Sequence, residues 1–223
     1  MTAAELKTAR TTAGWTQLRT AQRLGVTQAY LSMLERGERP VSDAVATRVA
    51  AHLPVTPTAL PFTGQRPEHF EDALGALGYP GFAYLRDGMR VNPAELLLLA
   101  LDTEDLPARV VEGLPWLPLA FPNLDWEWLF REAKVRNRQN RLGFILDLAR
   151  EATTHSRNPE MASLLTDKTN RLETSLLATE DSLCHASMGN AERTWLRTNR
   201  SPLAMRWNVL SDLKLSHLDH VYV

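Results

Sequence analysis

The stretch from Gln17 to Gly37 constrains the fold of this chain more than any other part of it. Its apolar and small residues recur at helical spacing in two groups, which are Leu18, Ala21 and Leu24, then Leu31 and Leu34. Gly25 lies between the groups, where the residue after a helix often needs a positive φ. Thr27 can then accept a backbone N–H bond at the start of the next helix. The stretch therefore predicts two short helices joined by a tight turn.

The second of these helices is predicted to expose a face without charge, which is unusual for a surface helix. That face holds Gln28, Ala29, Ser32 and Met33. Gln can bond the edge of adenine with two hydrogen bonds, Ser can bond any base, and Ala or Met can touch the thymine methyl. A neutral face of this kind is suited to base edges in the major groove.

Residues 6–60 resemble the helix-turn-helix domain of the XRE type, the family of the lambdoid phage repressors. The matching positions are Arg10, Gln17, Ala21, Gly25, Val26, Thr27, Gln28, Leu31, Leu34, Glu35 and Gly37. In that family the second helix of the motif lies in the major groove. One departure is Thr20, which stands where the family usually has an apolar residue.

The resemblance also implies roles for individual residues. Gln17 matches a phosphate contact, and Gln28 matches a base-reading position. Arg10 and Glu35 match a pair that bonds between helices while presenting the arginine to the DNA backbone. For Arg19 a solvated helix face is an equally good interpretation. The predicted DNA-binding residues are Arg10, Gln17, Arg19, Thr27, Gln28, Ala29, Ser32, Met33, Arg36 and Arg39.

The formal charge is shared unevenly along the chain. The whole sequence of 223 residues carries a net charge of −1, but residues 1–60 carry +3 and the remainder carries −4. The basic excess lies where the DNA contact is predicted. A charge of +3 implies few phosphate contacts for each protomer, so we expect a homodimer that reads two half-sites of double-stranded operator DNA.

Catalytic and metal-binding motifs are absent from the sequence. Cys184 and His185 are neighbours, which point in different directions on a helix. His217 and His220 have a helical spacing but no third ligand at a suitable position. A single cysteine excludes an internal disulfide framework, and no segment resembles a signal peptide or a membrane span. We therefore expect a cytoplasmic protein that is not an enzyme and uses neither a cofactor nor a metal.

The predicted fold class is all-α. Residues 1–60 are expected to form a five-helix repressor-like domain, 61–67 a linker, and 68–223 a larger helical domain for dimerisation and partner binding. Within the larger domain, 114–122 contains three prolines and is predicted to be an extended, buried connector. A long helix is predicted to follow from 126, with a kink at Gly143, and a further helical turn at 180–187.

The predicted long helix carries a stripe of cations, Arg131, Lys134, Arg138 and Arg141. Such a stripe is usually a solvated helix face. It is also the predicted surface for an acidic partner protein, and a nucleotide-like effector or flanking DNA phosphate are the other functional alternatives.

Together these observations predict a sequence-specific transcriptional repressor. The preferred interpretation is an autoregulatory, antitoxin-like protein whose second domain binds a cognate toxin. The alternative is an effector-sensing regulator, with a small molecule bound among Trp126, Trp128 and 114–122. An enzyme fused to a DNA-binding domain is a third and weaker alternative.

Overall fold

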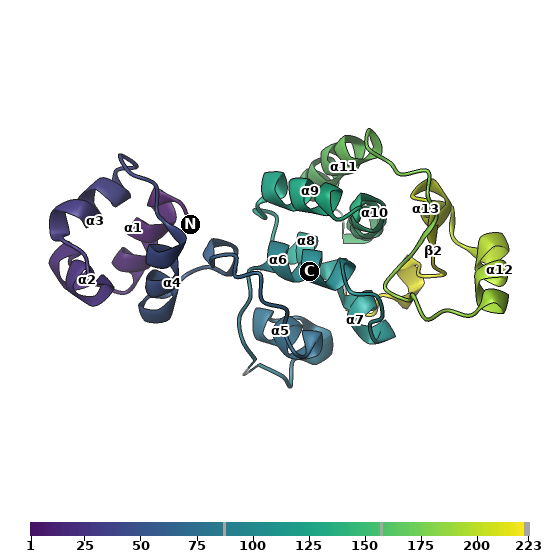
Figure 1. Ribbon diagram of the computed structural model, residues 1–223, viewed down its shortest axis with the longest axis horizontal. Helices are drawn as coiled ribbons and strands as arrows, with labels where there is room; N and C mark the ends of the chain where they lie inside the picture. The colour runs from purple at the N-terminus through teal and green to yellow at the C-terminus, as the bar shows by residue number, and fades with distance from the viewer. Residues whose placement is uncertain (87, 157, 221–223) are drawn as a thin grey trace. The chain divides into compact units, whose positions relative to one another are not determined.

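The computed structural model describes residues 1–86, 88–156 and 158–220. It divides into two compact units, Met1–Gln65 and Arg66–Val223, which are called the N-terminal and C-terminal units below. The all-α fold class is confirmed, because helices make up nearly all the regular structure in the described part of the chain (Figure 1). The last residues of the predicted second domain, 221–223, lie outside the described residues.

The N-terminal unit is a small bundle around one apolar core. Its elements are α1 (Ala3–Thr12), α2 (Gln17–Leu24), α3 (Gln28–Glu35), α4 (Asp43–His52) and the 3₁₀ turn η1 (Pro57–Ala59). Leu6, Leu24, Leu31, Leu34 and Val49 meet in the core, and each is fully buried. The predicted fifth helix is thus only one 3₁₀ turn.

Helix α2 buries a different face from the one predicted. Leu18 is 54% exposed, whereas Thr20, Ala21 and Leu24 are buried. The reason is geometric, because the three buried residues fall within about 100° of one another on a helix and Leu18 lies more than 100° from the middle of that arc. The Thr20 hydroxyl donates to the Thr16 carbonyl at 3.0 Å, so this polar departure from the family pattern is satisfied inside the core.

The C-terminal unit begins with α5 (Phe70–Leu77), η2 (Pro80–Phe82), α6 (Pro93–Leu101), α7 (Ala108–Gly113) and α8 (Trp116–Ala120). It continues with α9 (Trp126–Val135), α10 (Gln139–Ser156), α11 (Pro159–Glu173) and β1 (Asp181–Ser182). The last elements are α12 (Asn190–Asn199), α13 (Pro202–Arg206), β2 (Val209–Leu210) and η3 (Leu215–His217). Strands β1 and β2 pair in parallel, with Asp181 opposite Val209.

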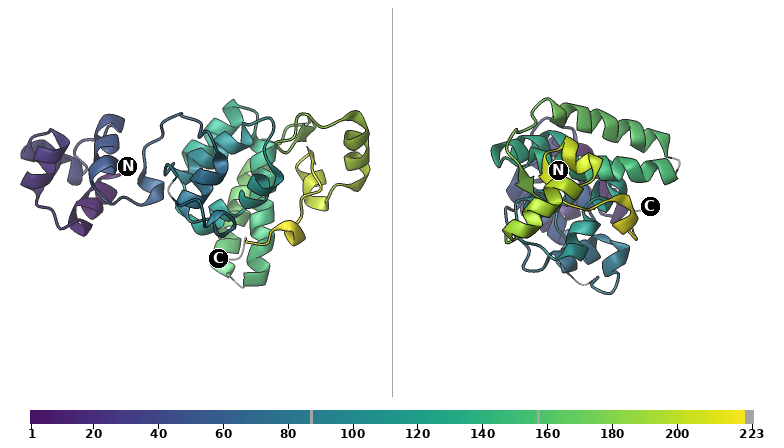
Figure 2. Two further views of the ribbon diagram at one scale, coloured as in Figure 1. Left: turned by 90° about the horizontal axis from the view of Figure 1, so that it is seen from below. Right: turned by 90° about the vertical axis from the view of Figure 1, so that its right-hand side faces the viewer.

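Helix α10 is the centre of the C-terminal unit. It packs against α6, α8, α9, α11 and α13, and every residue from 142 to 149 is buried. Helix α11 runs antiparallel along it (Figure 2). A helix that is covered on most sides needs apolar or small residues around its whole circumference. Gly143 lies here because the indole of Trp207, itself fully buried, occupies the space of a side chain at that position.

The predicted long helix and the predicted helical turn at 180–187 are both wrong. The long helix is broken into α9 and α10 at Asn137, which has a φ of 57° in the left-handed region, and not at Gly143. The Arg138 N–H donates to the Ala133 carbonyl at 2.7 Å and closes α9 with the bonding pattern of a Schellman motif. Residues 180–187 contain strand β1 and no helix.

The segment 114–122 contains helix α8 and is not extended. Pro115 precedes the helix and Pro118 lies in its first turn. Prolines are tolerated there because the first N–H groups of a helix have no partner within it. No helix among the described residues is long and apolar enough to cross a membrane.

Candidate nucleic-acid interface

Three local signals build the turn between α2 and α3. Thr16 caps α2 by accepting from the Arg19 N–H at 3.2 Å, and Thr27 caps α3 by accepting from the Tyr30 N–H at 3.1 Å. Gly25 has a φ of 64°, in the left-handed region where glycine is unstrained. The Val26 N–H then bonds the Ala21 carbonyl at 2.9 Å, which ends α2 tightly. These signals fix the direction in which α3 leaves the turn.

Helix α3 turns its uncharged face outward. Leu31 and Leu34 are fully buried, while Gln28 and Ala29 are exposed. Ser32 and Met33, one turn further along the helix, are half-buried. With about 100° between successive residues, the four outward positions cover an arc of about 140° opposite the two leucines. The backbone therefore places all four predicted base-facing residues on one side of one short helix.

A buried ion pair connects α1 to the end of α3. Arg10 Nε lies 2.6 Å from Glu35 Oε1, and Arg10 Nη2 lies 3.0 Å from Glu35 Oε2. The Gln17 amide donates to Glu35 Oε2 at 2.9 Å, and Arg10 Nη1 donates to the Trp15 carbonyl at 3.0 Å. Burial by itself would raise the pKa of Glu35, but the hydrogen bonds from Arg10 and Gln17 hold that pKa below its ordinary value.

This network changes how the predicted phosphate contacts are interpreted. The side chain of Arg10 is only 13% exposed, and that of Glu35 is 3% exposed. The Arg10 guanidinium thus donates hydrogen bonds to Glu35 and to the Trp15 carbonyl, and the Gln17 amide donates one to Glu35. The bonds from Arg10 and Gln17 to Glu35 hold the end of α3 in place. A contact of either residue with phosphate stays a prediction.

The remaining predicted contacts come from α2, from the two ends of α3 and from the loop that follows it. Arg19 is exposed and its guanidinium stacks 4.6 Å from the centre of the Trp15 ring. Arg36 is exposed and forms two hydrogen bonds with Glu38, at 2.7 and 3.0 Å. Arg39 is exposed in the loop that follows α3. The Thr27 hydroxyl oxygen already accepts the capping hydrogen bond from the Tyr30 N–H, so any contact of Thr27 with DNA would share that oxygen.

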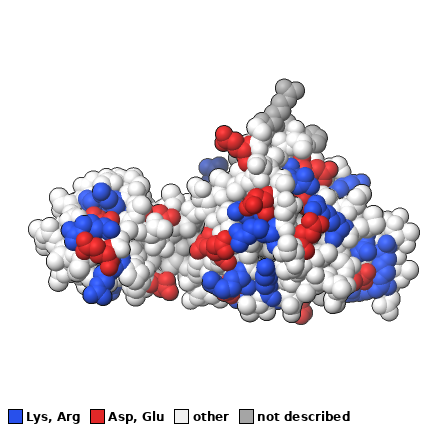
Figure 3. Space-filling model, turned by 90° about the horizontal axis from the view of Figure 1, so that it is seen from above, with Lys and Arg blue, Asp and Glu red and all other residues white. Residues whose placement is uncertain are grey.

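The predicted basic stripe in the C-terminal unit does not form a single surface. Arg141 is 5% exposed, and both its Nε and Nη2 bond the carboxylate of Asp181, at 2.6 and 2.7 Å. Arg138 bonds Asp102 at 3.0 Å. The prediction of one exposed stripe is wrong, because the helix breaks at Asn137 between Lys134 and Arg138 and because Arg141 is buried against Asp181. Basic and acidic side chains also alternate over the face shown in Figure 3.

Cys184 has the chemistry of a structural residue. It is buried, its thiol lies 3.3 Å from the Ala100 carbonyl, and burial raises its pKa to about 11. The thiolate that a nucleophile requires is therefore scarce at neutral pH. Among the described residues, no three His, Cys, Asp or Glu side chains are grouped closely enough to hold a metal ion.

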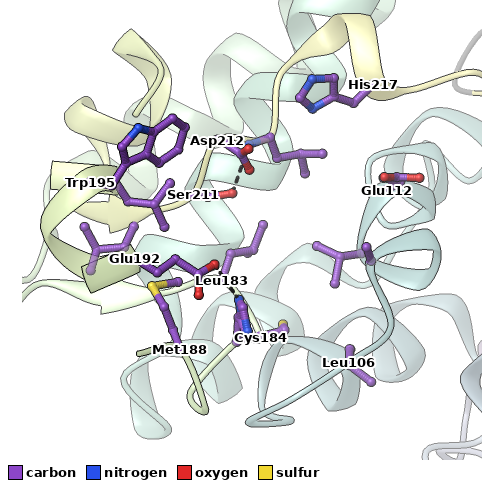
Figure 4. A pocket seen from close by; sticks show the side chains of 16 residues that line it. Leu106, Glu112, Leu183, Cys184, Met188, Glu192, Trp195, Ser211, Asp212 and His217 are labelled. Atoms are coloured by element: carbon purple, nitrogen blue, oxygen red, sulfur yellow. Dashed lines mark hydrogen bonds and ion pairs between the residues drawn. The ribbon is translucent and has the colours of Figure 1, made fainter. Parts of the chain in front are cut away.

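The C-terminal unit also contains a cavity of about 530 Å³, which sequence reasoning missed (Figure 4). Its lining comes from 106–112, 183–196 and 210–217, so no local spacing in the sequence could have indicated it. The small-molecule pocket that was predicted lies elsewhere, among Trp126, Trp128 and 114–122. Trp126 is 9% exposed and donates its Nε1 hydrogen to the Pro122 carbonyl at 3.0 Å, so its indole belongs to the core.

Comparison with known proteins agrees with the geometry of the N-terminal unit. A family model described as Helix-turn-helix matches residues 6–60. No curated protein and no solved structure matches the chain. Residues 6–60 are therefore an XRE-type helix-turn-helix domain, which is the DNA-binding domain of a transcriptional regulator.

Proposed function

We propose that this chain is a cytoplasmic, dimeric repressor that recognises a specific operator through α3. The observation that carries the proposal is the uncharged outward face of α3, with Gln28 and Ala29 exposed opposite a buried leucine pair. Base edges in the major groove offer donors, acceptors and methyl groups, which this face complements. Two exposed cations, Arg19 on α2 and Arg39 in the loop after α3, would contact the phosphates that position the helix.

Dimerisation follows from the modest charge of the DNA-binding unit. Residues 1–60 carry a net charge of +3, and Arg10 is already neutralised by Glu35. Few phosphate contacts give weak binding by one protomer at physiological salt. Two protomers on inverted half-sites would supply the missing affinity, and we assign dimerisation to the C-terminal unit.

Gln28→Ala tests the proposed reading of bases. The variant should lose about 1–3 kcal/mol on the preferred operator, because a side chain that bonds one base edge with two hydrogen bonds contributes that much discrimination. Binding to unrelated duplexes should stay unchanged. The measurement is a fluorescence-anisotropy titration of full-length protein on both kinds of duplex at one salt concentration.

Gln65→Ala is the matched control, because Gln65 is exposed and lies outside the helix-turn-helix. It should bind the operator like the unaltered protein. An equal loss of affinity by Gln28→Ala on operator and unrelated DNA would remove Gln28 from base reading.

For the C-terminal unit, a specific observation favours the effector-sensing role. The cavity of about 530 Å³ lies within the range of about 300–1,000 Å³ that is usual for small-molecule sites. The antitoxin-like, autoregulatory role stays a prediction from the sequence. Of the cations first assigned to a toxin partner, only Arg131 and Lys134 remain exposed.

A further inference from the structure

The cavity of the C-terminal unit opens between three elements that are distant in sequence. Helix α7 forms one wall, the stretch from β1 into α12 forms a second, and the segment from β2 to η3 closes the third side (Figure 4). All of its lining residues belong to the same compact unit. The cavity is therefore a feature of one folded body.

Part of the wall of this cavity is apolar and deeply buried. Leu183, Met188, Leu196 and Leu210 line it, and each of these side chains is at most 6% exposed. Val111 adds a further apolar contact from α7. Such a floor favours a ligand with a hydrocarbon body, because burying apolar surface contributes about 25 cal/mol for each Å² removed from water.

The charged groups of the cavity all have one sign. Glu112 on α7, Glu192 on α12 and Asp212 after β2 line it, and no Lys or Arg is among the described residues that do so. Figure 4 shows Glu112 and Glu192 on opposite walls. Two histidines, His185 and His217, also line the cavity, and Nδ1 of His185 lies 3.6 Å from the Glu192 carboxylate. A cation placed between these walls would be attracted from several sides.

An aromatic side chain lines the cavity from the same helix as one of these carboxylates. Trp195 lines the cavity and is 53% exposed, which is rare for so large an apolar side chain. It lies three residues after Glu192 on α12, so the two side chains share one helix face. An indole face attracts cations, and a neighbouring carboxylate adds to that attraction. The apolar floor, the acidic walls and the accessible indole all favour a positively charged ligand with an apolar body.

We propose that this cavity binds an organic cation with an apolar body, such as a quaternary ammonium or phosphonium compound. A metal ion does not fit the site, because the carboxylates lie on separate walls. A covalent adduct does not fit either, because the Cys184 thiol at the cavity is almost wholly protonated at neutral pH. The inference names the effector class for the effector-sensing role proposed above, and rests on that role only for the biological use of the site.

Two ions of the same shape and opposite charge provide the direct test. Tetraphenylphosphonium should bind full-length protein with one site per chain in isothermal titration calorimetry, without DNA. Tetraphenylborate should bind at least about tenfold more weakly, since its charge repels the carboxylates. Equal affinity for both ions would overturn the proposal, because it would show a hydrophobic surface without charge selection.

Variants then locate the site. The double variant Glu112→Gln, Glu192→Gln should weaken tetraphenylphosphonium binding about tenfold or more. Glu160→Gln removes one carboxylate charge from an exposed position on α11, outside the lining residues, and should bind normally. Equal losses in the two cases would place the ion elsewhere and contradict the inference. Because binding is measured without DNA, a failure here is distinct from a failure of operator recognition.

Discussion

Gly143→Ala is expected to lower the free energy of unfolding of the C-terminal unit by about 3 kcal/mol, at the upper end of the range for overpacked cores. A Cβ atom at this position would overlap the ring of Trp207. The ring has nowhere to move, because it is fully buried and its Nε1 donates to Asp147 at 2.7 Å. Urea denaturation followed by tryptophan fluorescence measures the loss, since five of the six tryptophans lie after residue 66.

Two further variants show whether the loss comes from this contact. Gly189→Ala places a methyl group where no atom lies within 4 Å and φ is −72°, so it should cost less than about 1 kcal/mol, the usual size of an N-cap effect. In a Trp207→Leu background, Gly143→Ala should cost little, because the overlapping ring is gone. The same cost in both backgrounds would contradict the packing explanation.

Arg10→Met is expected to destabilise the N-terminal unit by about 3 kcal/mol, because it leaves the buried carboxylate of Glu35 without its charged partner. Hydrogen exchange by mass spectrometry on the full chain resolves the effect, as faster exchange in α1 and α3. The double variant Arg10→Met, Glu35→Gln should recover most of the loss, since replacing both ions leaves no uncompensated charge. A double variant as unstable as the single one would refute this account of the pair.

The same ion pair sets a dependence on pH. The pKa of Glu35 is lower in the folded unit than its ordinary value of 4.5, so its contribution to stability is complete above about pH 4.5. The contribution is lost as the pH falls through the lowered pKa. Because an Arg10 variant also destabilises the N-terminal unit, weaker DNA binding by such a variant would not by itself identify a phosphate contact.

The helix-turn-helix could be predicted from the sequence because its signals are local. Thr16, Gly25 and Thr27 act within a few residues of themselves, and the leucines of α3 repeat at helical spacing. The helical spacing of Leu18, Ala21 and Leu24 wrongly predicted a buried Leu18, because Thr20 takes the core position by donating its hydroxyl hydrogen to the Thr16 carbonyl.

The C-terminal unit was less predictable because contacts between distant segments decide its structure. Asn137 ends α9 in a left-handed conformation, which only a minority of asparagines adopt. Arg141 is buried because Asp181, forty residues later, accepts two of its hydrogen bonds. The cavity likewise forms from three separate stretches of the chain. Its three carboxylates are therefore too far apart in the sequence to form a recognisable motif.

The most direct test of the central claim is a selection of sequences from a pool of random DNA duplexes by the full-length protein. Recognition by α3 in a dimer predicts an enriched inverted repeat whose half-sites are centred about 10 base pairs apart, or a multiple of that, on one face of the duplex. It also predicts an adenine in each half-site whose enrichment disappears with Gln28→Ala. Retention of DNA without enrichment of any sequence would contradict the claim that α3 reads an operator.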